Sequence, residues 1–406
     1  MWSAPPAVRR PHPEAPLLVV DVLLVLLLIA GLVVGIRRGL AGSAGVLIGL
    51  IAGVLLAFWL VPILGAVWPW PEWRMLALLV AVLVIVGAAT AIGAAIGRAV
   101  RRGVGATPLR TIDSVLGGVF GLVVALLSVS LVGSTVAAMA PPPIAAAISS
   151  STVLQTVDRF TPRPVSEALA RVRAAVLDDG LPRLGRLFEV GPTPLAPPAD
   201  LGDPDLTVAS ASVARISGNA YACGTSMTGS GFVVATDRVV TNAHVVAGVE
   251  VPVVQLPGEA AREGRIVYFD PIDDLAVIAV DALGVAPLSM GETLAPGAAA
   301  VVQGYPYGGP FTMTSAQVLT AGTVTVPDIY ADTGNPREVY ALAAEVRPGN
   351  SGGPLLTADG TVAGVVFARA DGDDQRGYAM TMAELLPVAT QAAGLSASVA
   401  TGACTT

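Results

Sequence analysis

Long apolar runs dominate the first third of the chain. Four stretches, residues 17–36, 42–64, 75–96 and 115–138, contain a single ionisable residue, Asp21. Each is close to the roughly 20 residues that a helix needs to cross a bilayer. Four buried helices of a water-soluble protein are the alternative, but such helices carry a polar face and these do not. The pattern therefore predicts a four-span anchor over residues 1–140, in contact with the lipid bilayer.

Arginine placement predicts how this anchor is oriented. Two loops, one between the first and second spans and one between the third and fourth, hold six arginines: Arg37, Arg38, Arg98, Arg101, Arg102 and Arg110. The opposite side holds three: Arg9, Arg10 and Arg74. Because basic loops stay on the cytoplasmic side, we expect everything after the fourth span to lie outside the cytoplasm. The Trp68, Trp70 and Trp73 loop suits the outer interface.

Residues 141–205 are predicted to connect two domains. A triple proline at residues 141–143 ends the last membrane helix. Val165, Leu169, Val172 and Val176 would then line one face of a helix over residues 165–177. That helix either packs on its neighbours, lies on the membrane or covers an active site. The proline-rich residues 191–198 form an extended spacer, and they are a candidate site of cleavage or self-cleavage.

From residue 206 onward the pattern changes to short β-branched runs separated by Gly, Pro and Asp. This spacing is typical of an all-β sandwich or barrel, and the length of residues 206–406 suits a double β-barrel. The predicted fold class is therefore a four-helix transmembrane bundle followed by an all-β double barrel.

Composition excludes several kinds of function. Hydrophobic residues make up 53% of the chain and charged residues 13%, with a net charge of −7. The acidic balance leaves no basic patch for nucleic acid. Two His and two Cys cannot supply a zinc site of the usual spacing. We therefore expect no nucleic acid, no metal and no cofactor.

Three short motifs point to nucleophilic catalysis. Thr-Asn-Ala-His-Val-Val contains His244, Asp-Asp-Leu-Ala-Val-Ile begins at Asp273, and Gly-Asn-Ser-Gly-Gly-Pro contains Ser351. A serine hydroxyl is a poor nucleophile until a base removes its proton, and His244 is the only His after residue 12. The glycines around Ser351 permit a tight turn in which backbone N–H groups converge. The order His, Asp, Ser differs from that of subtilisin and the α/β-hydrolases.

These motifs resemble the trypsin-like, chymotrypsin-fold serine proteases over residues 210–390. The resemblance implies that His244 is the general base, Ser351 the nucleophile, and the N–H groups of Gly349 and Ser351 the oxyanion hole. Asp270, Asp273 and Asp274 all precede the Leu-Ala-Val-Ile run. The family places its catalytic acid directly before Leu-Ala, which selects Asp274.

Substrate contacts follow from the same resemblance. The residue six before the nucleophile, Glu345, is a candidate for the base of the primary pocket, where it would favour a basic side chain or point elsewhere. Residues 364–369 should pair with an extended substrate as an added strand.

Two cysteines, Cys223 and Cys404, lie in the part expected outside the cytoplasm. Disulfides persist in that location, which favours a bond between them over two free thiols.

The four spans and the Arg37-Arg38-Gly39 turn resemble the colicin V production protein family. The whole architecture resembles the actinobacterial membrane-anchored periplasmic serine proteases linked to acid resistance. That resemblance implies cleavage of periplasmic or cell-wall proteins under acid or oxidative stress. The alternatives are a non-catalytic binding module, a membrane transporter with an attached processing domain, and a binder that becomes a protease in acid.

Overall fold

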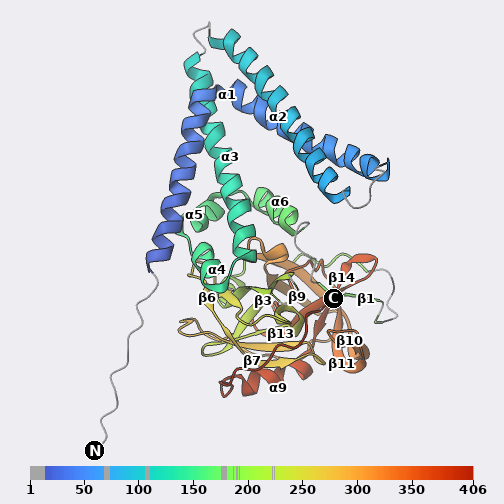
Figure 1. Cartoon of the computed structure of the whole chain (residues 1–406). Helices are drawn as coiled ribbons and strands as arrows, with labels where there is room; N and C mark the ends of the chain where they lie inside the picture. The colour runs from blue at the N-terminus through green and yellow to red at the C-terminus, as the bar shows by residue number, and fades with distance from the viewer. Residues whose placement is uncertain are drawn as a thin grey trace, which may run out of the picture. The chain divides into compact units, whose positions relative to one another are not determined.

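A computed structural model describes residues 14–67, 74–105, 110–174, 181–185, 187–188, 191, 193–221, 223 and 225–405. These residues divide into a helical unit, Asp21–Val129, and a second unit that contains Ser130–Thr406 and that we call the β unit (Figure 1). The loop with Trp68, Trp70 and Trp73 falls outside the described residues.

Within the described ranges, three helices are long and apolar enough to cross a membrane. They are α1 (Glu14–Val67), α2 (Arg74–Gly105) and α3 (Arg110–Met139). The predicted apolar helical region is confirmed, but the first two predicted spans both fall on α1. That helix breaks at Gly39, which has a φ of 69° and a ψ of 172°. The expected turn is therefore a single non-helical residue.

Glycines bring the helices of this unit into close contact. A Cβ atom on Gly93 would lie 2.2 Å from the carbonyl oxygen of Gly45, and one on Gly35 would lie 2.2 Å from that of Gly117. Small residues at such crossings allow helix backbones to approach in lipid, where apolar burial drives no association. Large side chains point outward instead, and Trp59 is 72% exposed. Such a surface suits lipid rather than water.

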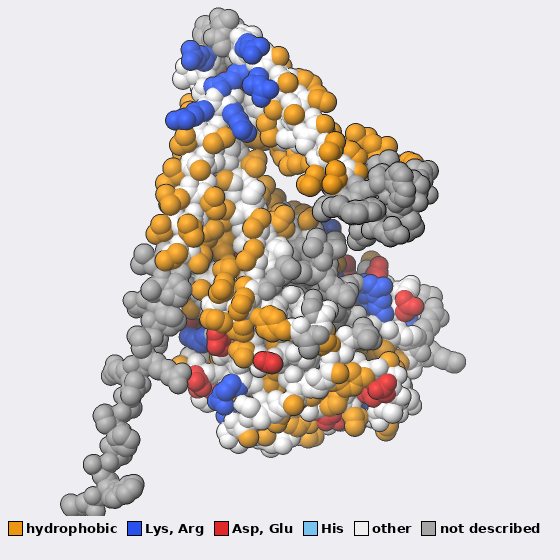
Figure 2. Space-filling model, in the orientation of Figure 1, with side chains coloured by type: hydrophobic (Ala, Val, Ile, Leu, Met, Phe, Trp, Pro, Cys, Tyr) orange, Lys and Arg blue, Asp and Glu red, His pale blue; other side chains and the backbone are white. Residues whose placement is uncertain are grey.

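Charged groups cluster around the break in α1. The Asp113 carboxylate accepts a hydrogen bond from Ala41 N at 3.1 Å, and Arg101 donates to Ile36 O at 3.4 Å. The Arg101 and Asp113 side chains approach to 3.6 Å. They thereby satisfy backbone groups that the break leaves without helical partners. Figure 2 shows the arginines of this unit gathered at one end.

The β unit begins with helices that sequence analysis predicted only in part. They are α4 (Pro142–Ser149), α5 (Thr152–Phe160), α6 (Arg163–Ala174) and α7 (Pro204–Ser210). The helix expected over residues 165–177 corresponds to α6, and residues 175–180 lie outside the described part. Leu206 of α7 is 1% exposed and packs into the core of the β unit.

Strands in the described part form two seven-stranded sheets. The first contains β2 (Val213–Ala220), β3 (Thr225–Ala235), β4 (Arg238–Thr241), β5 (Val253–Gln255), β6 (Arg262–Glu263), β7 (Arg265–Asp270) and β8 (Leu275–Ala279), in the order β6-β5-β2-β3-β4-β8-β7. The second contains β1 (Arg183–Leu184), β9 (Ala299–Gly304), β10 (Thr312–Pro327), β11 (Gly334–Ala343), β12 (Pro354–Leu356), β13 (Val362–Ala370) and β14 (Asp373–Met380).

The second sheet runs β13-β12-β9-β10-β11-β14 and closes because β14 also pairs with β13. The expected β structure is thus observed as two sheets, each with a buried cluster of its own, and both sheets also contribute to a shared core. Helix α9 (Met382–Ala392) packs against strands of both sheets (Figure 1). Its Leu385 is fully buried in the shared core. This shared core fixes the two sheets against each other, and the motif residues meet between them.

Candidate active site

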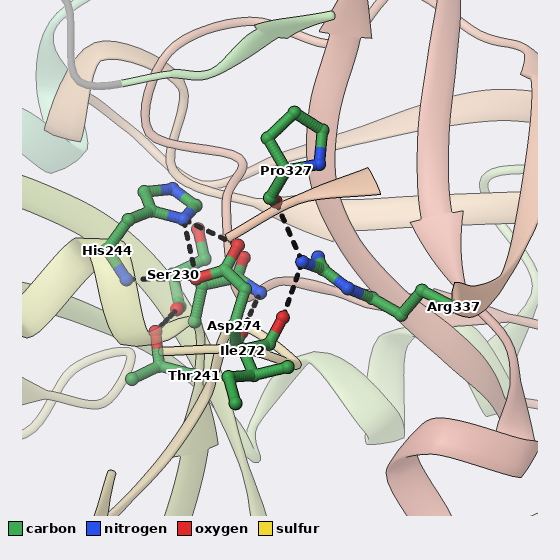
Figure 3. Close-up of polar contacts among 8 residues, drawn as sticks. Ser230, Thr241, His244, Ile272, Asp274, Pro327 and Arg337 are labelled. Atoms are coloured by element: carbon green, nitrogen blue, oxygen red, sulfur yellow. Dashed lines mark hydrogen bonds and ion pairs between the residues drawn. The ribbon is translucent and has the colours of Figure 1, made fainter. Parts of the chain in front are cut away.

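Strand register brings His244 and Asp274 together. Thr241 at the end of β4 pairs with Ala276 on β8, so the residues just beyond this pair become neighbours. His244 lies in the short helix α8 (Ala243–Val246), and its Nδ1 lies 2.8 and 2.9 Å from the two Asp274 carboxylate oxygens (Figure 3). The His244 backbone N–H also donates to Asp274 Oδ1 at 2.9 Å. One carboxylate therefore orients the imidazole and anchors its backbone.

Asp274 is the one carboxylate of the three candidates that contacts His244. It is buried and has a φ of 55°, an uncommon value for a residue other than glycine. Asn242 Nδ2 donates to its backbone oxygen at 2.8 Å. Asp273 instead donates its N–H to Asp270 Oδ1. Burial raises the pKa of Asp273, the Asp270 charge adds to the rise, and Arg337 opposes it.

The serine-bearing turn is held by β3. Ser230 N donates to Ser351 O at 2.8 Å, and Ser230 Oγ donates to Gly349 O at 2.6 Å. Tyr305 N in turn donates to Ser230 Oγ. Gly352 has a φ of 80°, and a Cβ there would lie 2.2 Å from Ser230 O, so only glycine fits. This role of Ser230 was not predicted, although the residue lies in a Gly-Ser-Gly segment, residues 229–231.

Two polar atoms at this point have no hydrogen-bond partner within the described residues. They are His244 Nε2 and Ser351 Oγ, and each of the two residues is 2% exposed. Buried polar groups in native proteins are nearly always paired. Catalytic hydrogen bonds often tighten only when substrate binds. The site thus contains an assembled His244–Asp274 pair and a buried Ser351 hydroxyl that no described group engages.

Backbone geometry at Gly349 leaves a donor free. The peptide bonds of the described chain are trans, so the carbonyl and the N–H of one peptide point in opposite directions. Pro348 O accepts a hydrogen bond from Tyr307 N at 2.5 Å, and Gly349 N–H therefore points away from Tyr307. Gly349 has a φ of 88°, and a Cβ there would lie 2.4 Å from Tyr305 O. No acceptor within the described residues takes up the N–H of Gly349 or Ser351.

Glu345 does not present a free carboxylate. Its Oε1 accepts from Arg347 Nε at 2.9 Å and from Arg347 Nη2 at 2.6 Å. The Glu345 carboxylate is therefore paired with Arg347, and it offers no unpaired negative charge to a basic side chain of a substrate.

The C-terminal end of the strand expected to receive substrate is paired with another segment of the chain. Strand β1 runs parallel to β13, with Arg369 N donating to Pro182 O at 3.2 Å and Asp371 N to Leu184 O at 2.8 Å. Leu181 just before β1 is 5% exposed. A cavity of about 520 Å³ beside His244 is lined by residues 181–184, the β10–β11 hairpin, Phe367 and Thr405.

The structure joins Cys223 and Cys404 in a disulfide, with Cα atoms 6.5 Å apart. Thr401 O accepts from Gly248 N, and Val399 N donates to Ile266 O, so the C-terminal segment lies along the first sheet. Among the residues described, no three His, Cys, Asp or Glu side chains gather as metal ligands would.

Comparison with known proteins places this geometry in a family. Residues 229–365 match the trypsin-like peptidase domain, and residues 20–162 match the colicin V production protein. Serine protease Rv3671c of Mycobacterium tuberculosis is 40% identical over 383 residues, which cover 91% of this chain and 94% of that protein. The putative serine protease HhoB of Synechocystis is 41% identical over 152 residues, 36% of this chain and 35% of its own length.

A crystal structure of the Rv3671c protease in its active form shares 38% identity, with a TM-score of 0.51. It covers 55% of this chain and 100% of its own. The chain is therefore a serine protease with a trypsin-like peptidase domain and a membrane-anchoring helical region. It belongs to the family of serine proteases that includes Rv3671c.

Proposed function

We propose that the chain is a membrane-tethered serine endopeptidase that cleaves proteins outside the cytoplasm, with His244, Asp274 and Ser351 as its triad. The observation that carries the proposal is the assembled His244–Asp274 pair, together with two buried atoms that lack a partner among the described residues, His244 Nε2 and Ser351 Oγ. These are the two atoms between which the first proton transfer of acyl-enzyme formation takes place.

In this mechanism Ser351 Oγ attacks the scissile carbonyl carbon while His244 Nε2 takes the hydroxyl proton. The Asp274 carboxylate holds the Nδ1–H and stabilises the imidazolium that forms. The N–H groups of Gly349 and Ser351 donate to the oxyanion of the tetrahedral intermediate. The C–N bond then breaks, His244 returns its proton to the departing amine, and water hydrolyses the acyl-enzyme by the same route.

Labelling with a fluorophosphonate tests this assignment. The full chain in detergent should react covalently with the probe, and Ser351→Ala should not react. Ser289→Ala, which removes an exposed serine, is the matched control and should label like the wild type. An unlabelled wild type across pH 5–9 would instead favour a binding module that kept the fold.

The membrane part is proposed as a four-span bundle. Helix α1 has 54 residues and would be about 80 Å long if straight, against a hydrocarbon core of about 30 Å. The break at Gly39 lets its two halves cross separately. With the arginine-rich end in the cytoplasm, the β unit lies outside. An alkaline phosphatase fused after residue 140 should be active, and a fluorescent protein fused there should not.

Finer aspects of the function rest on the resemblance to the family. We infer that both sheets act as barrels of a chymotrypsin-like fold, that the substrates are periplasmic or cell-wall proteins, and that the enzyme supports survival in acid or oxidative stress. Self-cleavage in residues 191–198 belongs to the same proposal. Cells that carry only Ser351→Ala should retain the uncleaved chain and lose acid tolerance.

A further inference from the structure

We propose that Arg337 is a positioning residue for catalysis, which holds the acid-bearing turn, residues 271–274, in place from the opposite sheet. This inference rests on the proposed function, because the turn matters only if Asp274 serves His244. Arg337 belongs to no motif recognised in the sequence, and it is separated from Ile272 by 65 residues.

Its contacts define the role. Arg337 lies on β11 of the second sheet and is 1% exposed. One nitrogen, Nη2, donates to Ile272 O at 2.6 Å and to Pro327 O at 3.0 Å (Figure 3). Ile272 stands two residues before Asp274, in the turn between β7 and β8 of the first sheet. The guanidinium thus ties the acid-bearing turn of one sheet to the end of β10 in the other.

A second contact reaches the substrate side. The Arg337 guanidinium carbon lies 5.6 Å from the centre of the Phe367 ring, within the range of a cation–π interaction. Phe367 lines the same cavity as His244. One buried cation therefore touches the acid-bearing turn, the end of β10 and the strand expected to bind substrate.

The turn needs such support because its geometry is demanding. Asp274 occupies the left-handed region and makes three contacts to His244. Within the turn, Asp270 Oδ1 accepts from the N–H groups of Ile272 and Asp273, which organises its start. The carbonyl of Ile272 is left to Arg337. Loss of that bond would let the segment before Asp274 shift, and a shift of about 1 Å at a catalytic group can cost about 100-fold in rate.

Stability alone does not explain this side chain. Burying a guanidinium is costly, and an apolar residue of similar size is often as stable or more so. Arg337 Nε has no acceptor among the described residues, so the group is not fully satisfied. The acidic groups that face it are Asp273 and Glu384, and its charge opposes the rise that burial causes in the pKa of each.

The test compares Arg337→Met with Arg376→Met in the full chain in detergent. Arg376 is the matched control, since it is 2% exposed and bonds Gly191 O and Thr193 Oγ1, but not the acid-bearing turn. Arg337→Met should lower the fluorophosphonate inactivation rate, corrected for folded fraction, by about 100-fold. Arg376→Met should leave the corrected rate unchanged even if both variants melt earlier. Arg337→Lys, which retains the positive charge and one donor nitrogen, should recover part of the loss.

A spectroscopic measurement separates this inference from the proposed function. His12→Gln leaves His244 as the only imidazole of the chain, so its Nδ1–H resonance can be followed without ambiguity. The low-field proton of the His244–Asp274 bond should be present in this background and lost on adding Arg337→Met, whether or not the enzyme reacts with the probe. A folded Arg337→Met that retains both the resonance and the wild-type rate would overturn the inference. If Arg337→Met does not fold, a wild-type rate in Arg337→Lys would do the same.

Discussion

Removal of the disulfide is the perturbation whose magnitude follows most directly from the structure. Cys223→Ser with Cys404→Ser deletes a bond that closes 181 residues, from just before β3 to the C-terminal segment. The C-terminal segment keeps other contacts, including the hydrogen bonds from Gly248 N to Thr401 O and from Thr401 Oγ1 to Val249 O. We therefore expect the folded state to change little and the unfolded state to gain most of the freedom.

The size of the effect comes from the loop length. With a separation of 181 residues, the chain-entropy relation gives about 18 cal/mol/K, or about 5 kcal/mol at 25 °C. For a unit of this size, about 5 kcal/mol corresponds to a Tm shift of about 10–20 °C. Residual structure in the unfolded chain reduces the measured value, so the lower end of that range is the expected outcome.

Two kinds of aromatic residue allow the two units to be followed separately. Four of the five Trp lie within residues 21–129, the fifth is Trp2, and all seven Tyr follow residue 220. Near-ultraviolet tyrosine circular dichroism of the full chain in detergent therefore reports the β unit, and tryptophan fluorescence reports the helical unit. The double variant should lower the tyrosine transition and leave the tryptophan transition in place.

The control is chemical reduction. Dithiothreitol should lower the tyrosine Tm of the wild type to that of the double variant and should not affect the variant. A shift below about 2 °C in both experiments would refute the reasoning, because the closed loop would then contribute almost nothing.

Three further predictions test the site and its surroundings. Ser230→Ala removes the hydroxyl that supports the Ser351 turn, so fluorophosphonate reaction should slow by about 10-fold or more while the Tm falls by no more than a few degrees; an unchanged rate contradicts the proposed support. Burial raises the pKa of Glu384, so the fold binds its proton more tightly than the unfolded chain and loses stability as pH rises above about 4.5. The Tm advantage of Glu384→Gln over wild type should therefore grow from pH 4 to pH 7, and a constant difference would count against burial as the cause. Leu181→Asp removes about 2 kcal/mol of apolar burial from the segment beside His244, which should free the β13 edge and speed peptide hydrolysis by up to about 30-fold; equal rates would mean that β1 does not compete with substrate.

Sequence reasoning identified the residues whose chemistry is confined to short motifs. His244, Asp274 and Ser351 each stand in a local pattern, and the structure brings the first two into contact as expected. The register of β4 and β8 also supports the choice of Asp274 over Asp273. This contact is predictable because the pairing of β4 with β8 determines which residues beyond the two strands become neighbours.

The supporting residues were not predictable in the same way. Arg337 and Ser230 act on segments 65 and 119 residues away, and no local pattern signals which carbonyl a buried donor will meet. The role of Glu345 stays a prediction with two alternatives, and its pairing with Arg347, two residues away, could not be foreseen from its distance to the nucleophile. The distance from Ser351 along the chain predicts where Glu345 lies. Whether its carboxylate is unpaired depends on its partner Arg347, which that distance does not indicate.

The same distinction explains the helical unit. Hydropathy identifies segments that prefer lipid, and the apolar helices of the structure agree with it. It does not show whether two such segments are separated by a loop or by one residue. At Gly39 the break needs no loop, because Arg101 and Asp113 from the other two helices satisfy the exposed backbone groups. Arg101 and Asp113, near the ends of two other helices, thus bond the backbone groups that the residues of a turn would otherwise satisfy. The sequence Arg37-Arg38-Gly39 therefore indicates that the chain turns there, but it does not show that the turn is a single residue.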